Sequence, residues 1–143
     1  MKKVYFATPV NGRKELTKQM KKEAALQRCI EVRYKLHTIH PDWIVTFSFN
    51  VCPVEDMKLT EAEAMGRCVT LLMACDALIL DDGWMESAGC NVERSVAANY
   101  NKRIITIGQA KLLQAKVSYV SSVVMTMKFR FIQTLRTIRT LRR

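Results

Sequence analysis

A carboxylate and a phenol stand out among the residues that could do chemistry. Glu93 falls in the first turn of a helix expected over residues 90–101, and that helix follows a glycine-containing loop at 81–89. Glu93 should therefore face a pocket, where a carboxylate can stabilise developing positive charge or bond covalently to a reacting carbon. Tyr5, in the first expected strand, could orient it. The alternatives are an acid that only favours the helix dipole and an ordinary strand aromatic.

Other residues near these two could bind an anion or a flat ring. Ser87, beside the start of that helix, suits a phosphate or carboxylate, although a plain helix cap would look the same. Trp84 could stack on a base, or pack over the sheet edge. Arg13, with the turn pair Asn11-Gly12, could meet an anion or simply be solvated.

The elements that must position these residues alternate between strand and helix patterns. The run at 77–80 is apolar on both faces, which is typical of a central parallel strand. Thr60 and Glu63 have the spacing of a capping box at a helix start. Strands are expected at 4–10, 43–50, 77–80 and 104–107, and helices at 13–36, 60–74 and 90–101.

This alternation predicts one α/β domain over residues 1–108, with a Rossmann-like (flavodoxin-like) parallel sheet of four to five strands and helices on both faces. Such sheets bind ligands at the carboxyl ends of their strands. The loops at 8–13 and 81–89 both fall at such ends, so the sequence places a pocket there.

Apolar spacing also predicts which helix faces are buried. Lysines of the first helix, at 14, 18, 21 and 22, are expected to point outward. The residues expected to face inward are Leu16, Met20, Ala24 and Ile30 in the first helix, Met65, Val69, Leu72 and Met73 in the second, and Val92, Val96 and Ala97 in the third.

The composition indicates a globular chain with a real core, because 49% of its 143 residues are hydrophobic. No apolar run approaches the roughly 20 residues that span a bilayer, and the start is too brief for a signal peptide. Five cysteines and two histidines do not have the spacing of a zinc site. Free thiols in a reducing cytoplasm are therefore expected.

The net charge of +10 belongs to the end of the chain. Residues 109–143 hold 8 of the 23 basic residues and none of the 13 acidic ones. Apolar residues there recur mostly every three or four positions, which predicts a basic amphipathic helix from about residue 119, although the alternation at 125–131 would also allow a strand. It could pack on its own domain or on a second copy, lie on an anionic membrane, or contact nucleic acid phosphates.

Three stretches carry a resemblance to a known family: the opening strand and turn at 4–13, the helix-to-strand step at 75–80, and the loop and helix start at 83–93. In the third stretch the order and spacing of Gly-Trp, Ser, Gly and Glu agree together. The chain resembles the nucleoside 2-deoxyribosyltransferases and the related 2′-deoxynucleoside 5′-phosphate N-hydrolases, in particular a bacterial and phage branch of that group. The similarity covers about residues 4–107.

The resemblance implies an N-glycosidase that hydrolyses or transfers 2-deoxyribose of a nucleoside or nucleotide. It implies Glu93 as nucleophile and Tyr5 as its partner, with no metal or organic cofactor. Members of the family usually form homodimers or higher oligomers. The implied substrate-binding residues are Asn11, Gly12, Arg13, Asp82, Trp84, Ser87 and Gly89.

Two positions depart from the family pattern. Cys68 stands where members commonly carry an aspartate that assists proton transfer, and a thiol with an ordinary pKa near 8.5 is a poor substitute. Pro9 stands where phosphate-hydrolysing relatives carry a serine donor, and proline contributes no N–H. The alternative is therefore a catalytically diverged module that binds a nucleotide-like ligand.

Overall fold

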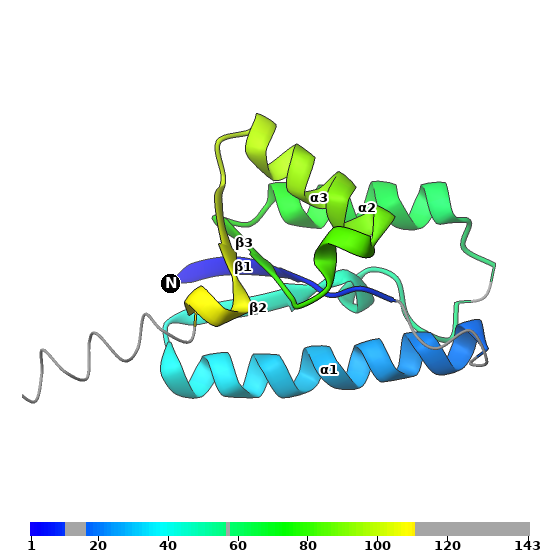
Figure 1. Ribbon diagram of the computed structural model, residues 1–143, viewed down its shortest axis with the longest axis horizontal. Coiled ribbons are helices and arrows are strands. Elements are labelled where there is room, and N and C mark those ends of the chain that lie inside the picture. Colours follow the sequence, from blue (N-terminus) through cyan, green and yellow to red (C-terminus); the bar gives the residue numbers. More distant parts are fainter. Residues whose placement is uncertain (11–16, 57, 111–143) are drawn as a thin grey trace, which may run out of the picture. The chain divides into compact units, whose positions relative to one another are not determined.

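Four parallel strands form the sheet in the computed structural model, which describes residues 1–10, 17–56 and 58–110 (Figure 1). The order across the sheet is β2-β1-β3-β4, and the described residues up to Ala110 form one compact unit. The predicted α/β architecture with a parallel sheet is confirmed. The strands are β1 (Lys2–Ala7), β2 (Trp43–Phe47), β3 (Ala77–Leu80) and β4 (Arg103–Thr106).

The two central strands, β1 and β3, form the base of the site. Tyr5 pairs with Leu78, and Ala7 pairs with Leu80, so both strands end at the same level. All four residues of β3 are at most 2% exposed. This complete burial explains why that strand is apolar on both faces.

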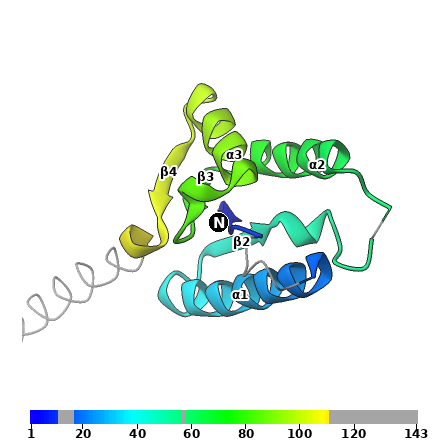
Figure 2. The same cartoon turned by 45° about the vertical axis from the view of Figure 1, so that its right-hand side comes forward.

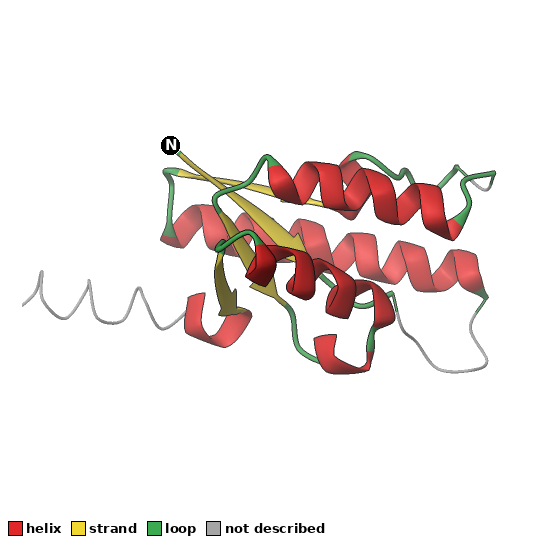
Figure 3. Cartoon of the chain, turned by 90° about the horizontal axis from the view of Figure 1, so that it is seen from above, coloured by secondary structure: helices red, strands yellow, loops and turns green. Residues whose placement is uncertain are grey.

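Helices cover both faces of the sheet, as predicted. Helix α1 (Lys18–Ile39) lies on one face, and α2 (Glu61–Met73) and α3 (Ala88–Asn99) lie on the other (Figures 1 and 2). Seen from above, α2 and α3 lie side by side over the strands (Figure 3). The expected turn at 11–13, Leu16 and the basic helix from residue 119 lie outside the described residues.

Side-chain caps set where the helices begin. The Thr60 hydroxyl accepts a hydrogen bond from the Glu63 backbone N–H at 3.2 Å, and the Glu63 carboxylate accepts one from the Thr60 N–H at 2.9 Å. This confirms the predicted capping box of α2. Helix α1 begins after Thr17, whose hydroxyl caps the Met20 N–H, while residues 13–16 of the expected helix lie outside the described residues.

Several predicted strand ends were wrong, because the strands end earlier than expected. β1 ends at Ala7, not residue 10. After Phe47 the chain turns into a short 3₁₀ helix, Ser48–Asn50, because Asn50 Oδ1 accepts from the Phe47 N–H at 2.8 Å. β4 ends at Thr106, where Thr106 and Gln109 cap a helical turn starting at residue 107.

The predicted face of α1 was wrong. Met20 and Ile30 are 49% and 40% exposed, and Ala24 is exposed as well. A step of six residues turns a helix by about 240° beyond one full turn, so Ala24 and Ile30 cannot share a face. The residues that pack inward repeat every three or four positions and are Ala25, Cys29, Val32 and Leu36.

The faces of α2 and α3 also differ from the prediction. In α2, Leu72 is buried as expected, but Cys68 is its buried companion and Met73 is exposed. In α3, Ala97 is buried as expected, while Val92 is 43% exposed. Cys90 and Glu93 are buried together with Ala97. The buried face of α3 therefore includes a carboxylate, which the hydrophobic pattern did not predict.

No helix in the described part of the chain has both the length and the apolar character needed to cross a membrane.

Candidate active site

Tyr5 and Glu93 meet in the interior of the domain. The Tyr5 hydroxyl donates a hydrogen bond of 2.5 Å to Glu93 Oε1. The two residues are 0% and 5% exposed. Because α3 begins at Ala88, Glu93 lies beyond the first turn where sequence spacing put it, and the helix dipole falls off within that turn. A buried carboxylate held by a phenol needs another explanation than the dipole.

Burial sets the charge state of this pair. Desolvation raises the pKa of Glu93 to about 7, and the hydrogen bond from Tyr5 opposes part of that rise. Burial and the neighbouring carboxylate raise the pKa of Tyr5 well above its ordinary value. The phenol therefore keeps its proton and donates, while the carboxyl group changes charge near neutral pH.

Glu93 opens into a cavity of about 350 Å³. This volume is within the range of small-molecule sites. Ser87 and Gly89, at the start of α3, line the same cavity, as does Thr8, which directly follows β1. The described lining residues are Thr8, Val10, Lys18, Lys22, Ser48, Phe49, Cys52, Leu59, Thr60, Glu61, Ala64, Met65, Cys68, Ser87, Ala88, Gly89, Cys90 and Glu93.

Two lysines and a helix N-terminus line this cavity beside the carboxylates of Glu61 and Glu93, and they are the groups that could hold an anion. Lys18 and Lys22 come from the first two turns of α1. Ser87 is the N-cap of α3, and its hydroxyl accepts from the Cys90 N–H at 3.4 Å. Lys18 Nζ also lies 3.7 Å from Oε1 of the exposed Glu61 carboxylate, and a surface ion pair of this kind contributes little to stability.

The lysines were expected on the solvent side of the first helix. Lys18 is exposed as expected and Lys22 is half-buried, and both also line the cavity. The signal that could have found them is topological. The helix that follows β1 begins at the carboxyl edge of the sheet, so its first turns border any pocket there.

The remaining residues that the sequence singled out are not among the described lining of this cavity. Asp82 is exposed and lines a different cavity, on the α1 side. Trp84 is not among the described lining of the Glu93 cavity. It packs against the core, and the Arg94 guanidinium lies 5.3 Å from its ring centroid. The turn at 11–13 lies outside the described residues.

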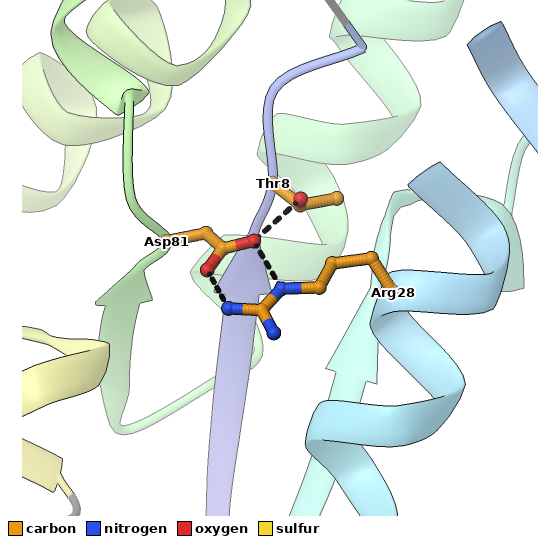
Figure 4. Close-up of polar contacts among 3 residues, drawn as sticks. All are labelled: Thr8, Arg28 and Asp81. Carbon is orange, nitrogen blue, oxygen red and sulfur yellow. Dashed lines mark hydrogen bonds and ion pairs between the residues drawn. The ribbon is translucent and has the colours of Figure 1, made fainter. Parts of the chain in front are cut away.

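An ion pair between the buried Asp81 and the half-buried Arg28 ties the ends of β1 and β3 to α1 (Figure 4). Arg28 donates to both oxygens of Asp81, from Nε at 2.9 Å and from Nη2 at 2.6 Å. The Thr8 hydroxyl donates to Asp81 Oδ2 at 2.9 Å. Burial raises the pKa of Asp81, but the hydrogen bonds from Arg28 and Thr8 outweigh it, and the pKa lies below its ordinary value.

This ion pair matters for the site because of Thr8. Thr8 lines the Glu93 cavity and also a second cavity of about 330 Å³, which Arg28, Asp81 and Asp82 border from the α1 side. Asp81 therefore holds the residue that separates the two cavities. Sequence reasoning could not place Asp81, although an acid directly after a buried central strand is a signal for this edge.

The chain matches one family by sequence. A family described as a domain of unknown function (DUF4406) matches residues 2–106, which include every strand and helix that builds the cavity. The chain belongs to this family. No curated protein matches the sequence.

Among solved structures, the fold of this DUF4406 domain is similar to "2-desoxiribosyltransferase from Leishmania mexicana", with a TM-score of 0.52 and 18% identity. The match covers 74% of this chain and 63% of that chain, so the DUF4406 protein aligns with less than two thirds of that relative's length. At this identity the likeness concerns the fold. The resemblance to deoxyribosyltransferases that the sequence suggested is confirmed at that level.

The cysteines of the DUF4406 domain are all free. Cys68 is buried and lines the Glu93 cavity, and its sulfur lies 4.0 Å from that of Cys52. Burial raises the pKa of Cys68 to about 12, so its thiol stays protonated. Within residues 1–10, 17–56 and 58–110, no three His, Cys, Asp or Glu side chains are grouped so that they could hold a metal ion.

Proposed function

We propose that this DUF4406 protein is an N-glycosidase that hydrolyses or transfers the 2-deoxyribosyl group of a nucleoside or nucleotide. The observation that carries the proposal is the buried Tyr5–Glu93 hydrogen bond in the wall of a cavity of ligand size. The fold, which is similar to that of a deoxyribosyltransferase, also supports the proposal. So does the position of the cavity at the carboxyl ends of the central strands, where parallel sheets bind their ligands.

In this mechanism Glu93 attacks the anomeric carbon of the sugar. Breaking an N-glycosidic bond leaves positive charge on that carbon, and a carboxylate stabilises it or forms a glycosyl-enzyme bond. Tyr5 holds Oε1, which leaves Oε2 for the sugar. The base departs with the electrons of the broken bond. In hydrolysis, water then adds its hydroxyl group to the sugar, Glu93 is released as a carboxylate, and the proton of the water ends on the departed base. In transfer, a second base takes the sugar, and its N–H proton ends on the first base.

The pKa of Glu93 sets the pH range of this reaction. Only the ionised carboxylate is a nucleophile, and its pKa of about 7 leaves a large share protonated in neutral solution. Base release should therefore rise as the pH passes through 7. A carboxyl group with an ordinary pKa would already be fully ionised there.

Ser87, Lys18 and Lys22 support a substrate that carries an anionic group, such as a 5′-phosphate. The Ser87 hydroxyl sits at the N-terminus of α3, and the two ammonium groups come from α1. Helix N-termini and lysines both favour phosphate. The sequence-based candidates for substrate binding also include residues 11–13, Gly89, Asp82 and Trp84.

The five free thiols favour a protein of the reducing cytoplasm.

Cys68 favours a second candidate function, a module that binds a nucleotide-like ligand without cleaving it. A thiol with a pKa of about 12 is a weak acid for protonating a departing base. If no other group supplies that proton, the cavity would bind its ligand and turnover would be absent.

The test is base release from a panel of deoxynucleosides and their 5′-monophosphates, read by chromatography. Glu93→Ala should abolish release, and Glu86→Gln should preserve it, because Glu86 lines only the second cavity among those described. Thermal stabilisation by a panel member without free base would favour the binding module. Full activity of Glu93→Ala would refute the mechanism, and folded wild-type protein that neither binds nor cleaves would refute both functions.

A further inference from the structure

Two thiols touch in the wall of the Glu93 cavity. The sulfur atoms of Cys52 and Cys68 are 4.0 Å apart, and theirs is the only hydrogen-bonding contact between two sulfurs among the described residues. Cys68 lies on α2, and Cys52 lies in the irregular segment between the 3₁₀ helix and α2. Both line the cavity, so a small reagent that enters it reaches both sulfurs.

The other cysteines lack such a partner within the described part of the chain. Cys29 is completely buried on α1, on the opposite face of the sheet. The Cys75 thiol donates to the Leu71 carbonyl oxygen at 3.3 Å. Cys90 lines the cavity but is 2% exposed, and among the described residues its sulfur makes no hydrogen-bonding contact with another sulfur. Among the described cysteines, Cys52 and Cys68 are therefore the pair that can act as a dithiol.

The pair can come together without breaking a helix. A disulfide needs the sulfurs about 2.05 Å apart, so they must approach by about 2 Å. Cys52 is outside any helix or strand and is only partly buried, so rotation of its side chain and adjustment of its segment can supply that approach. Its one thiol hydrogen bond to backbone, to the Ala64 carbonyl at 3.6 Å, is long and easily given up.

We propose that Cys52 and Cys68 form a modification site, a dithiol that hydrogen peroxide oxidises to an intramolecular disulfide in the cavity wall. This proposal does not depend on the glycosidase activity.

The two steps balance in atoms and electrons. The Cys52 thiolate attacks one peroxide oxygen, the O–O bond breaks, and hydroxide leaves and takes up the proton that Cys52 released. The Cys68 sulfur then attacks the sulfur of the Cys52 sulfenic acid, and the hydroxyl group departs with the Cys68 proton as water. Two thiols are oxidised, and one peroxide is reduced to two molecules of water.

The order of attack follows from exposure. Cys52 is the more accessible sulfur, whereas Cys68 is buried and its thiol stays protonated because burial raises its pKa to about 12. Thiolates are the reactive form. Cys68 therefore acts as the resolving thiol, and its contact with Cys52 puts it in place to do so.

The test is peptide mapping of the full chain after hydrogen peroxide treatment, without reduction. Trypsin cuts after Lys58 and Arg67, so Cys52 and Cys68 fall in separate peptides unless a disulfide joins them. We expect linked peptides 36–58 and 68–94 and an intact mass that has lost two hydrogen atoms. Dithiothreitol should restore both peptides.

Matched variants identify the sulfur, because Cys75 and Cys90 share the 68–94 peptide. The link should survive in Cys75→Ser and Cys90→Ser and vanish in Cys52→Ser and Cys68→Ser, with Cys68→Ala in reserve if the serine variant does not fold. Circular dichroism checks folding. A link that survives loss of Cys52 or Cys68, a dimer linked between chains, or folded wild type that forms no link would each overturn the proposal.

Discussion

Replacing Glu93 with glutamine should stabilise the folded protein at alkaline pH while it removes the proposed nucleophile. The glutamine side chain has nearly the same shape and could still accept the hydrogen bond from Tyr5. What the substitution removes is the charge that burial opposes. A residue that lowers stability in its ionised form is typical of a site kept for function.

The expected magnitude follows from the pKa of Glu93, which rises from 4.5 to about 7 on folding. Below pH 4.5 the carboxyl group is neutral in both states and contributes nothing. As the pH rises from 4.5 towards 7, the unfolded chain ionises while the folded chain keeps its proton, so folding loses free energy. At about 1.4 kcal/mol per pH unit, the full penalty above pH 7 is about 3 kcal/mol.

Urea unfolding of the wild type and Glu93→Gln at about pH 4, 6 and 8 measures this difference. The variant should equal the wild type at the lowest pH and exceed it by about 3 kcal/mol at the highest.

Glu63→Gln is a control of opposite sign. The hydrogen bonds from Thr60 lower the pKa of Glu63, so its ionised form stabilises the folded chain above its unfolded pKa, and this contribution is lost as the pH falls. Glu63→Gln should therefore be the less stable protein at pH 8 and approach the wild type in acid. If the difference between wild type and Glu93→Gln does not change with pH, Glu93 does not ionise in a desolvated site and the argument fails.

Two further substitutions test the surroundings of Glu93. Tyr5→Phe removes the hydrogen bond that lowers the pKa of Glu93, so the midpoint of the pH profile of kcat/KM for base release should move upward; an unchanged midpoint would contradict the pairing. Asp81→Asn leaves the Arg28 guanidinium without its carboxylate and should lower the free energy of unfolding by about 2–4 kcal/mol in urea titrations. The neighbouring Asp82→Asn, which changes an exposed side chain, should cost less than about 0.5 kcal/mol, and equal losses in both would refute the ion-pair account.

Local patterns in the sequence predicted much of the fold. The four apolar residues of β3 and the Thr60–Glu63 capping box each depend on neighbours within a few positions, and both were predicted correctly. Helix faces were predicted less well. The residues expected to face inward on α1 do not share one helix face, and which side packs on the sheet depends on distant strands. Ala25 and Cys29 are therefore buried where Ala24 and Ile30 were expected.

The site shows the same limit. Sequence spacing singled out Glu93, and in the structure Glu93 pairs with Tyr5. The sequence did not predict that Asp81 pairs with Arg28, because these residues are 53 positions apart. The sequence also did not predict that Cys52 lines the cavity, since its contact with Cys68 forms only once α2 has packed. Side chains that meet only through tertiary structure leave no periodic signal in a single sequence.

The long separation of Tyr5 and Glu93 also bears on how the protein is made. Their hydrogen bond joins residues 88 positions apart, and β1 finds its parallel neighbour β3 only after more than half of the domain has been synthesised. Contacts of this range are slow to form. A half-folded chain therefore carries a solvated glutamate with an ordinary pKa, and the pKa of Glu93 rises to about 7 only once α3 has packed on the sheet and Glu93 has met Tyr5.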